Sequence, residues 1–172
     1  MKKCFLGNRI VILGCPGSGK STLAARLRAL TGLPLLHLDN IWWKPDRTHI
    51  SADAFDRELE TLIKKDKWII DGDYSRTYET RIRSCDTIVF LDLDEEECMA
   101  GIMNRIGKKR DDIPWVESRP DPGLEELVRG YHDQNRPKVY TLMEKYPDKQ
   151  ILIFRTRAQA DEWISGFGRE TE

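Results

Sequence analysis

A glycine-rich segment near the amino terminus carries the residues whose types and spacing point most clearly to chemistry. The segment from Gly14 to Ser21 reads GCPGSGKS and fits the pattern GxxxxGK[ST]. Four apolar residues precede it, and a stretch with apolar residues at helical spacing follows. Glycines let successive main-chain N–H groups turn toward one anion, and a helix that starts there directs its positive dipole end to the same point. The pattern therefore predicts a phosphate-binding loop between a strand and a helix.

The chemistry expected at this loop is the binding of a nucleoside triphosphate, most simply ATP with Mg²⁺. Lys20 would place a mobile positive charge near the β- and γ-phosphates, and the hydroxyl of Ser21 can bind Mg²⁺. The residues assigned to the nucleotide are Gly14, Cys15, Pro16, Gly17, Ser18, Gly19, Lys20, Ser21 and Thr22. The alternative is a structural glycine turn with a surface lysine, which four fixed motif positions between a strand and a helix disfavour.

The elements that must position this loop alternate along the chain between strand-like and helical patterns. Apolar runs predict strands at 9–13, 35–38, 68–71, 87–91 and 150–154. Helical spacing predicts a helix that ends near Gly32, a second that begins after an N-cap at Ser51, and a long helical stretch from about 124 to 147 with a kink at Pro137. This alternation predicts an α/β fold with a mainly parallel sheet.

The length and charge of the chain narrow its class. With 172 residues it fits a single domain, and a net charge of −1 gives no global electrostatic reason for a nucleic-acid or membrane partner. The apolar runs have the length of strands, and Arg9 interrupts the one nearest the amino terminus, so we expect a cytoplasmic protein. The cysteines lack CxxC spacing and are expected to be reduced thiols. They are Cys4, Cys15, Cys85 and Cys98.

The loop alone does not name a reaction, because phosphate loops occur in switches, motors and small-molecule kinases. A guanine-nucleotide switch would carry an NKxD-type run after a later strand, and no asparagine in this chain begins one. Motor ATPases generally need longer chains and partner subunits. The short chain and its remaining arginines favour a kinase that closes over two substrates.

Four further motifs resemble the adenylate-kinase-like family. They are the loop GCPGSGKST, the run HLD at 37–39, the run WIIDGDY at 68–74, and DTIVFLDL followed by NRIGKKR. Within that family the chain most closely resembles the group known as DNA topology modulation proteins. The resemblance covers nearly the whole chain. It implies a single domain over 1–172, built as a three-layer α/β/α sandwich with a five-stranded parallel sheet of order 2-3-1-4-5. It also implies an acceptor-binding region at about 39–66 and a small helical lid at about 105–136.

The resemblance implies that Arg105 and Lys109, in NRIGKKR, are basic lid residues that contact the triphosphate and stabilise the transferred phosphoryl group. Their spacing of four would let both face one way from a helix and its end. Arg110 could take the place of Lys109, and Arg136 could swing toward the phosphates on closure. The alternative is a solvated basic helix end balanced by the two aspartates that follow.

Two aspartates compete for the role of the acid that orients Mg²⁺. Asp71 ends the third predicted strand, which the implied strand order places beside the strand of the phosphate loop. Asp92 follows the fourth strand and has equivalent spacing. The implied order favours Asp71, which would therefore face both the metal and the substrates.

The acceptor-binding residues are also implied by the resemblance. Asp39 follows the second strand, where a carboxylate could act as a general base, with a helix or turn cap as the alternative. Arg76 and Arg81 could hold an acceptor phosphate or carboxylate, although adenylate kinases read DGFPRT where this chain reads DGDYSRT. Trp43, with Trp42, could stack on a flat acceptor, or one could pack in the core while the other covers a loop.

These features together predict an ATP-dependent phosphotransferase that moves the γ-phosphoryl group to a small acceptor such as a nucleoside monophosphate. The protein would be a monomer or homodimer. The competing hypothesis is an ATP-binding regulator or DNA topology modulation protein without a small-molecule acceptor. A third is a nucleotide-binding protein that has lost turnover.

Overall fold

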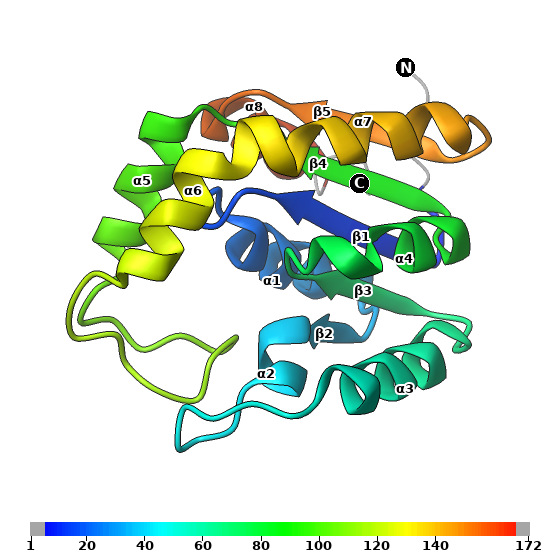
Figure 1. Cartoon of the computed structure of the whole chain (residues 1–172). Helices are drawn as coiled ribbons and strands as arrows, with labels where there is room; N and C mark the ends of the chain where they lie inside the picture. The colour runs from blue at the N-terminus through cyan, green and yellow to red at the C-terminus, as the bar shows by residue number, and fades with distance from the viewer. Residues whose placement is uncertain (1–5, 168–172) are drawn as a thin grey trace.

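A computed structural model describes residues 6–167 and contains a five-stranded parallel sheet with helices on both faces (Figure 1). The strands are β1 (Arg9–Gly14), β2 (Leu35–His37), β3 (Trp68–Asp71), β4 (Thr87–Leu91) and β5 (Gln150–Phe154). The helices are α1 (Lys20–Thr31), α2 (Leu38–Trp42), α3 (Ala52–Ile63), the short 3₁₀ helix η1 (Ser75–Thr77), α4 (Tyr78–Ser84), α5 (Glu95–Asn104), α6 (Pro122–Gln134), α7 (Arg136–Lys145) and α8 (Arg157–Phe167). The strand order β2-β3-β1-β4-β5 confirms the predicted fold class.

The middle of the sheet explains where the site must lie. β1 runs between β3 and β4, with Ile12 paired to Asp71 and Gly14 paired to Leu91. Its apolar residues are fully buried, as expected for a parallel sheet covered on both faces. In Figure 1, α1 and α8 lie behind the sheet, and α4 and α7 lie in front of it. The carboxyl ends of the three central strands therefore meet at one edge, where ligands bind in folds of this type.

The helix ends follow the predicted signals with one difference. Gly32, with φ of 70°, ends α1, and the side chain of Ser51 accepts a hydrogen bond from the N–H of Ala54 at 3.2 Å. The long helical stretch is two helices rather than one kinked helix, because Asn135 ends α6 and precedes α7. Pro137 lies in the first turn of α7, where its missing N–H leaves no hydrogen bond unmade.

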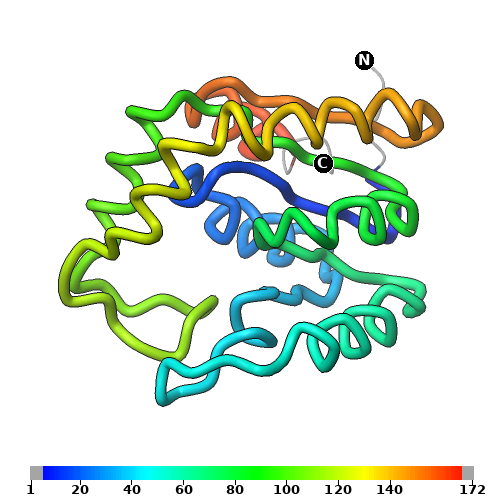
Figure 2. Tube along the Cα trace, viewed as in Figure 1, coloured from blue at the N-terminus to red at the C-terminus, as the bar shows by residue number. Residues whose placement is uncertain are grey.

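The connection between α5 and α6, residues 105–121, leaves the helical pattern that the sequence predicted for its start. α5 ends at Asn104, and Gly107 adopts a left-handed φ of 77°. Arg105 and Lys109 therefore do not share a helix face. The connection runs along the carboxyl edge of the sheet toward α2 (Figure 2). Within residues 6–167, no helix is both long and apolar enough to cross a membrane.

Candidate active site

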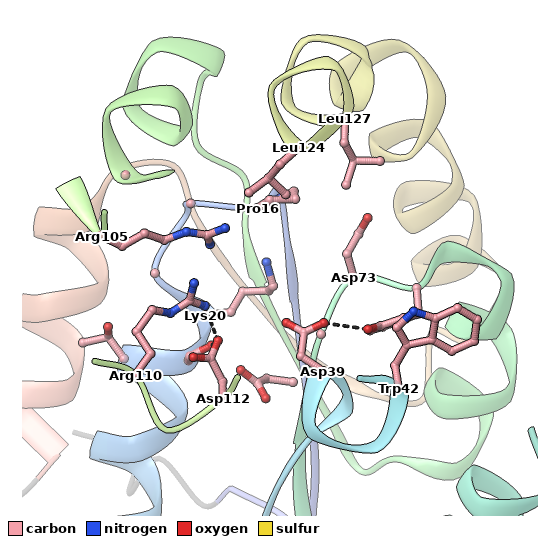
Figure 3. A pocket seen from close by; sticks show the side chains of 18 of the residues that line it. Pro16, Lys20, Asp39, Trp42, Asp73, Arg105, Arg110, Asp112, Leu124 and Leu127 are labelled. Atoms are coloured by element: carbon pink, nitrogen blue, oxygen red, sulfur yellow. Dashed lines mark hydrogen bonds and ion pairs between the residues drawn. The ribbon is translucent and has the colours of Figure 1, made fainter. Parts of the chain in front are cut away.

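A cavity of about 950 Å³ lies at the carboxyl edge of the sheet. Its wall combines the phosphate loop, α2, the turn after β3, the end of α5 with the connection that follows, and the facing sides of α6 and α7 (Figure 3). This volume is near the upper end of the range typical of small-molecule sites. The motifs at Gly14–Ser21, 37–39, 68–74 and 104–110 thus meet around one cavity, as the fold places them.

The phosphate loop has the backbone that an anion cradle requires. Gly14, Gly17 and Gly19 adopt φ values of 150°, 80° and 97°, which side chains with a Cβ rarely adopt. Lys20 is largely buried, and its Nζ donates a hydrogen bond to the carbonyl oxygen of Cys15 at 2.9 Å. The lysine therefore lies along the loop with its charge beside the N–H groups, an arrangement that fits a triphosphate.

Arg157, which no sequence motif predicted as a site residue, supports the phosphate loop through hydrogen bonds to its main chain. Its guanidinium donates to the carbonyl oxygens of Gly17, Ser18 and Glu97, at 3.2 Å to Ser18 and 3.0 Å to Glu97. Arg157 begins α8, about 140 residues from the loop, and belongs to none of the recognised motifs. No local sequence signal could have identified it.

Cysteine side chains pack beneath the same loop. Cys15 and Cys98 are buried and free, and a hydrogen bond between the two thiols raises the pKa of Cys15. Cys85 is also buried and free, whereas Cys4 lies outside the described residues. The side chain of Cys15 therefore belongs to the core, while its carbonyl oxygen accepts the hydrogen bond from Lys20.

The contact between the loop and α5 gives a first prediction. A Cβ added to Gly101 would lie 1.9 Å from the carbonyl oxygen of Gly17. We expect Gly101→Ala to lower the free energy of unfolding by about 1–3 kcal/mol, because one backbone must move. ATP affinity should fall as well, since Gly17 is part of the cradle. Urea unfolding and calorimetric titration measure the two effects. The matched control is Gly166→Ala in α8, where a Cβ meets nothing within 4 Å. Equal stability of the two variants would contradict this packing.

A chain of ion pairs joins the 105–121 connection to the phosphate loop. The hydroxyl of Ser21 donates to Asp112 Oδ2 at 2.8 Å, and Asp112 pairs with Arg110. Arg110 also reaches Glu117 at 2.9 Å, and Glu117 pairs with Arg105 at 2.8 Å. Burial alone would raise the pKa of Asp112, but the charge and hydrogen bond of Arg110 outweigh it and lower that pKa. The sequence treated Asp112 only as a balancing charge and did not identify Glu117.

The predicted basic residues differ in whether a carboxylate already engages their side chains. Arg105 and Arg110 line the cavity with their guanidinium groups engaged by carboxylates, whereas Lys109 lines it beside Lys108. Burial lowers the pKa of Arg105. Glu117 engages Nε and Nη2 of Arg105, and Glu117 and Asp112 engage Nη1 and Nη2 of Arg110, so the carboxylates use only part of the five N–H donors of each guanidinium group.

The two candidate metal-orienting aspartates occupy different surroundings. Asp71 is 2% exposed, lines the cavity at the end of β3, and accepts a 2.7 Å hydrogen bond from Nδ1 of His37. Asp92 does not line the cavity. Its oxygens are occupied by Arg136 at 2.7 and 3.0 Å and by Tyr140 at 2.7 Å. Arg136 is thus paired with Asp92 at the end of β4.

His37 was given no role from the sequence, and its pairing with Asp71 predicts a dependence of stability on pH. Burial alone would lower the pKa of His37, but the hydrogen bond and charge of Asp71 outweigh it and raise that pKa. A raised folded-state pKa stabilises the protein below the unfolded value of about 6.5, and this stabilisation is lost as pH rises through the folded pKa. We expect His37→Asn to destabilise the protein more at pH about 5.5 than at about 8.5. Urea unfolding at both pH values measures the difference, and a pH-independent cost would contradict the pairing.

Asp39 lies across the cavity from the phosphate loop. The hydroxyl of Tyr74 donates to Asp39 Oδ1 at 2.6 Å, so this oxygen bonds a side chain from the turn after β3. Burial raises the pKa of Asp39, and the charges of Asp112 and Asp71 act in the same direction. A half-buried carboxylate with a raised pKa, beside a phosphate site, can accept a proton from an acceptor hydroxyl.

The two arginines assigned to the acceptor are not presented to the cavity. Arg81 is fully buried and donates to the carbonyl oxygens of Gly72 at 3.0 Å and Asp73 at 2.6 Å, so it fixes the turn after β3. Arg76 forms an exposed ion pair with Asp56 and is not among the cavity residues. The sequence placed both arginines correctly after β3, but spacing could not tell which way their side chains turn.

The tryptophans do reach the cavity. Trp42 and Trp43 both line it. Trp42 stacks on His49 with ring centroids 4.4 Å apart, and Trp43 contacts Trp115 edge to face at 5.5 Å. Both rings are thus partly supported by protein and partly open to a ligand.

Comparison with known proteins agrees with this fold. No protein-family model matches the chain. It is 22% identical over 151 residues to an adenylate kinase from Kosmotoga olearia, which covers 83% of this chain and 68% of that protein. Its structure is similar to shikimate kinase from Acinetobacter baumannii in complex with shikimate, with a TM-score of 0.61, 15% identity, and coverage of 93% and 90% of the two chains. The chain shares the fold of this kinase structure.

A second similar structure is a sugar kinase from Janibacter sp. HTCC2649, with a TM-score of 0.55, 17% identity, and coverage of 93% and 91%. A shikimate kinase from Bacteroides thetaiotaomicron has a TM-score of 0.59 at 16% identity and covers 92% of this chain. These structural similarities agree with the family resemblance as far as the fold is concerned. The finer resemblance to the DNA topology modulation group stays a prediction.

Proposed function

We propose that this protein is an ATP-dependent phosphotransferase that moves the γ-phosphoryl group of ATP to a hydroxyl group of a small acceptor. One observation carries the proposal: a phosphate loop with Lys20 and a half-buried carboxylate, Asp39, line the same cavity. The adenylate, shikimate and sugar kinases to which the chain is similar support the coarser class, phosphoryl transfer from ATP to a small acceptor.

On the donor side, the phosphate loop would hold the triphosphate and Lys20 would stabilise charge on the transferred group. Kinase sites bind Mg²⁺ through few protein groups together with phosphate oxygens and water. Ser21 would be a direct ligand, and Asp71 would act through water; both line the cavity. Bound Mg²⁺ would supply charge neutralisation at the phosphates. Ser21 donates its hydroxyl proton to Asp112, which leaves the oxygen lone pairs for the metal, so this hydrogen bond could persist when Mg²⁺ binds.

Residues 105–136 would act as the lid, and residues 39–66 as the acceptor-binding region. On closure Arg105 and Arg110 would exchange Glu117 and Asp112 for phosphate oxygens, and Lys109 would join them. Because the arginines are already paired, they can exchange one anion for another without passing through an unpaired buried state. Closure would exclude water and limit wasteful hydrolysis.

The proposal is tested by ADP release from MgATP across a panel of nucleoside monophosphates, nucleosides, sugars and small hydroxy acids. The expected result is at least one acceptor that raises turnover well above basal hydrolysis. If every compound leaves the basal rate unchanged, the kinase assignment fails. DNA binding measured at several salt concentrations addresses the regulator hypothesis, which predicts salt-dependent affinity at physiological ionic strength.

A further inference from the structure

Cations are concentrated at one end of the cavity, although two carboxylates besides those of the opposite end also line it: Asp112, which pairs with Arg110, and Asp71 at the end of β3. These cations come from the phosphate loop, from the end of α5 with the connection that follows it, and from the start of α8. They are Lys20, Arg105, Lys108, Lys109, Arg110 and Arg157. The opposite end carries Asp39 and Asp73 together with aromatic rings. Figure 3 shows Arg105 and Arg110 on one side, Asp39, Asp73 and Trp42 on the other, and Lys20 between them. The positive end fits a triphosphate, so the acidic and aromatic end is left for the acceptor.

The acceptor end offers no arginine fork among the described residues that line the cavity. As described above, Arg76 pairs with Asp56 outside the cavity, and Arg81 is buried against main-chain carbonyl oxygens. An anionic acceptor needs such donors, because a phosphate or carboxylate loses its hydration on entering a partly buried site.

One lysine does line this end, and its surroundings are acidic. Lys138 Nζ donates to Asn135 Oδ1 at 3.4 Å, and Asn135 Nδ2 donates to Asp73 Oδ2 at 3.1 Å. Asp73 Oδ1 also accepts a hydrogen bond from the hydroxyl of Tyr78. Lys138 thus belongs to a polar wall that already contains a carboxylate, and an added anion would meet Asp73 as well as the ammonium group.

The remaining lining at this end is apolar and flat. Trp42, Trp43 and Tyr74 present aromatic rings, and Leu124 and Leu127 project from α6 above Asp73 (Figure 3). Leu127 is 40% exposed although it is apolar. Aromatic faces of this kind suit a base or the C–H face of a sugar ring.

We propose, on the basis of the phosphotransferase function above, that the acceptor is a ring-containing alcohol without a phosphate or carboxylate group, of the nucleoside or sugar class. In the reaction, the acceptor hydroxyl oxygen forms a bond to the γ-phosphorus while the bond from that phosphorus to the bridging oxygen breaks. ADP leaves with the electron pair, and the hydroxyl proton passes to the Asp39 carboxylate. The phosphate group of a phosphorylated acceptor would lie near the carboxylates of Asp39 and Asp73, and the like charges would repel each other.

The test compares matched acceptor pairs with MgATP: adenosine with AMP, thymidine with TMP, and ribose with ribose 5-phosphate. We expect kcat/KM for the best unphosphorylated compound to exceed that of its phosphorylated partner by about tenfold or more. Preference for the phosphorylated members would overturn the inference and leave the phosphotransferase proposal intact. Turnover with none of the six compounds would overturn the inference. Failure of the wider ADP-release panel as well would overturn both.

A variant of Asp73 tests whether the negative charge of this residue causes the preference. Asp73→Asn keeps the shape of the side chain and removes its charge, so the preference for the unphosphorylated partner should fall by about threefold or more. Asp161→Asn is the matched control, because Asp161 in α8 forms an exposed ion pair with Arg26 away from the cavity, and its preference should equal that of the wild type. Calorimetric titration of each matched pair in the presence of ADP, which measures acceptor binding without turnover, should show the same change of preference. An unchanged preference in Asp73→Asn would contradict the proposal.

Discussion

Lys20→Ala is expected to lower kcat for phosphoryl transfer by about 10²–10³, the usual cost of removing one preorganised group that stabilises the transition state. The ammonium group lies beside the cradle of N–H groups and is held there by the carbonyl oxygen of Cys15 at 2.9 Å. Its positive charge counts most as charge develops on the transferred phosphoryl group. Steady-state kinetics with the best acceptor measures kcat, and calorimetric titration measures ATP affinity.

The matched control for this variant is Lys67→Ala, which removes an exposed lysine just before β3, away from the cavity, and should leave kcat unchanged. Urea unfolding must show that Lys20→Ala keeps its fold. A kcat within about threefold of the wild-type value would show that the loop does not act in transfer. A wild-type protein that binds ATP without any turnover would instead support the hypothesis of a binding protein that has lost activity.

Asp39→Asn is expected to lower kcat by about 10²–10⁴, the range for loss of a general base. The amide oxygen can still accept the hydrogen bond from Tyr74, so the fold and ATP affinity should change little. Because burial raises the pKa of Asp39, the wild-type rate should rise with pH at values above those of an ordinary carboxyl group. The pH profile of kcat/KM measures this limb in the wild type.

Tyr74→Phe sharpens the test of Asp39. The tyrosine hydrogen bond lowers the pKa of Asp39 and partly offsets the effect of burial. Its removal should move the acid limb of the rate profile to higher pH and cost much less at high pH than Asp39→Asn does. An acid limb that stays in place in Tyr74→Phe, or a normal kcat in Asp39→Asn, would exclude Asp39 as the base.

Most of the fold was predictable because its signals are local. The predicted strand at 68–71 matches β3, and the strand at 9–13 differs from β1 by one residue. The strand predicted to end at Leu38 stops at His37, because Leu38 is the first residue of α2. Apolar runs bounded by turn residues determine such boundaries. The strand order came from family resemblance rather than from periodicity.

The site was only partly predictable, because its finer contacts join distant parts of the chain. The loop motif brings Gly14–Ser21 to the cavity whatever surrounds it. The hydrogen bond between Ser21 and Asp112 spans 91 residues, and the contact of Arg157 with Ser18 spans 139. Arg81 shows the complementary difficulty. An arginine after a strand can face a ligand or satisfy buried carbonyl groups, and only the packed structure decides between them.

The roles of individual residues remain proposals with clear alternatives. Asp71 lines the cavity and Asp92 does not, which supports Asp71 as the residue that would orient Mg²⁺. The lid at 105–136 rests on the position of its basic residues beside the phosphate loop. The resemblance to DNA topology modulation proteins stays a prediction, and DNA-binding measurements address it directly.

The fate of the γ-phosphoryl group tests the central claim most directly. Phosphorus NMR can follow MgATP in the presence of the protein and its best acceptor from the panel. If the protein is a phosphotransferase, the γ-phosphorus signal is replaced by that of a phosphate ester of the acceptor, formed in a one-to-one ratio with ADP. Release of inorganic phosphate in a one-to-one ratio with ADP, with no ester signal, would show hydrolysis and contradict the account.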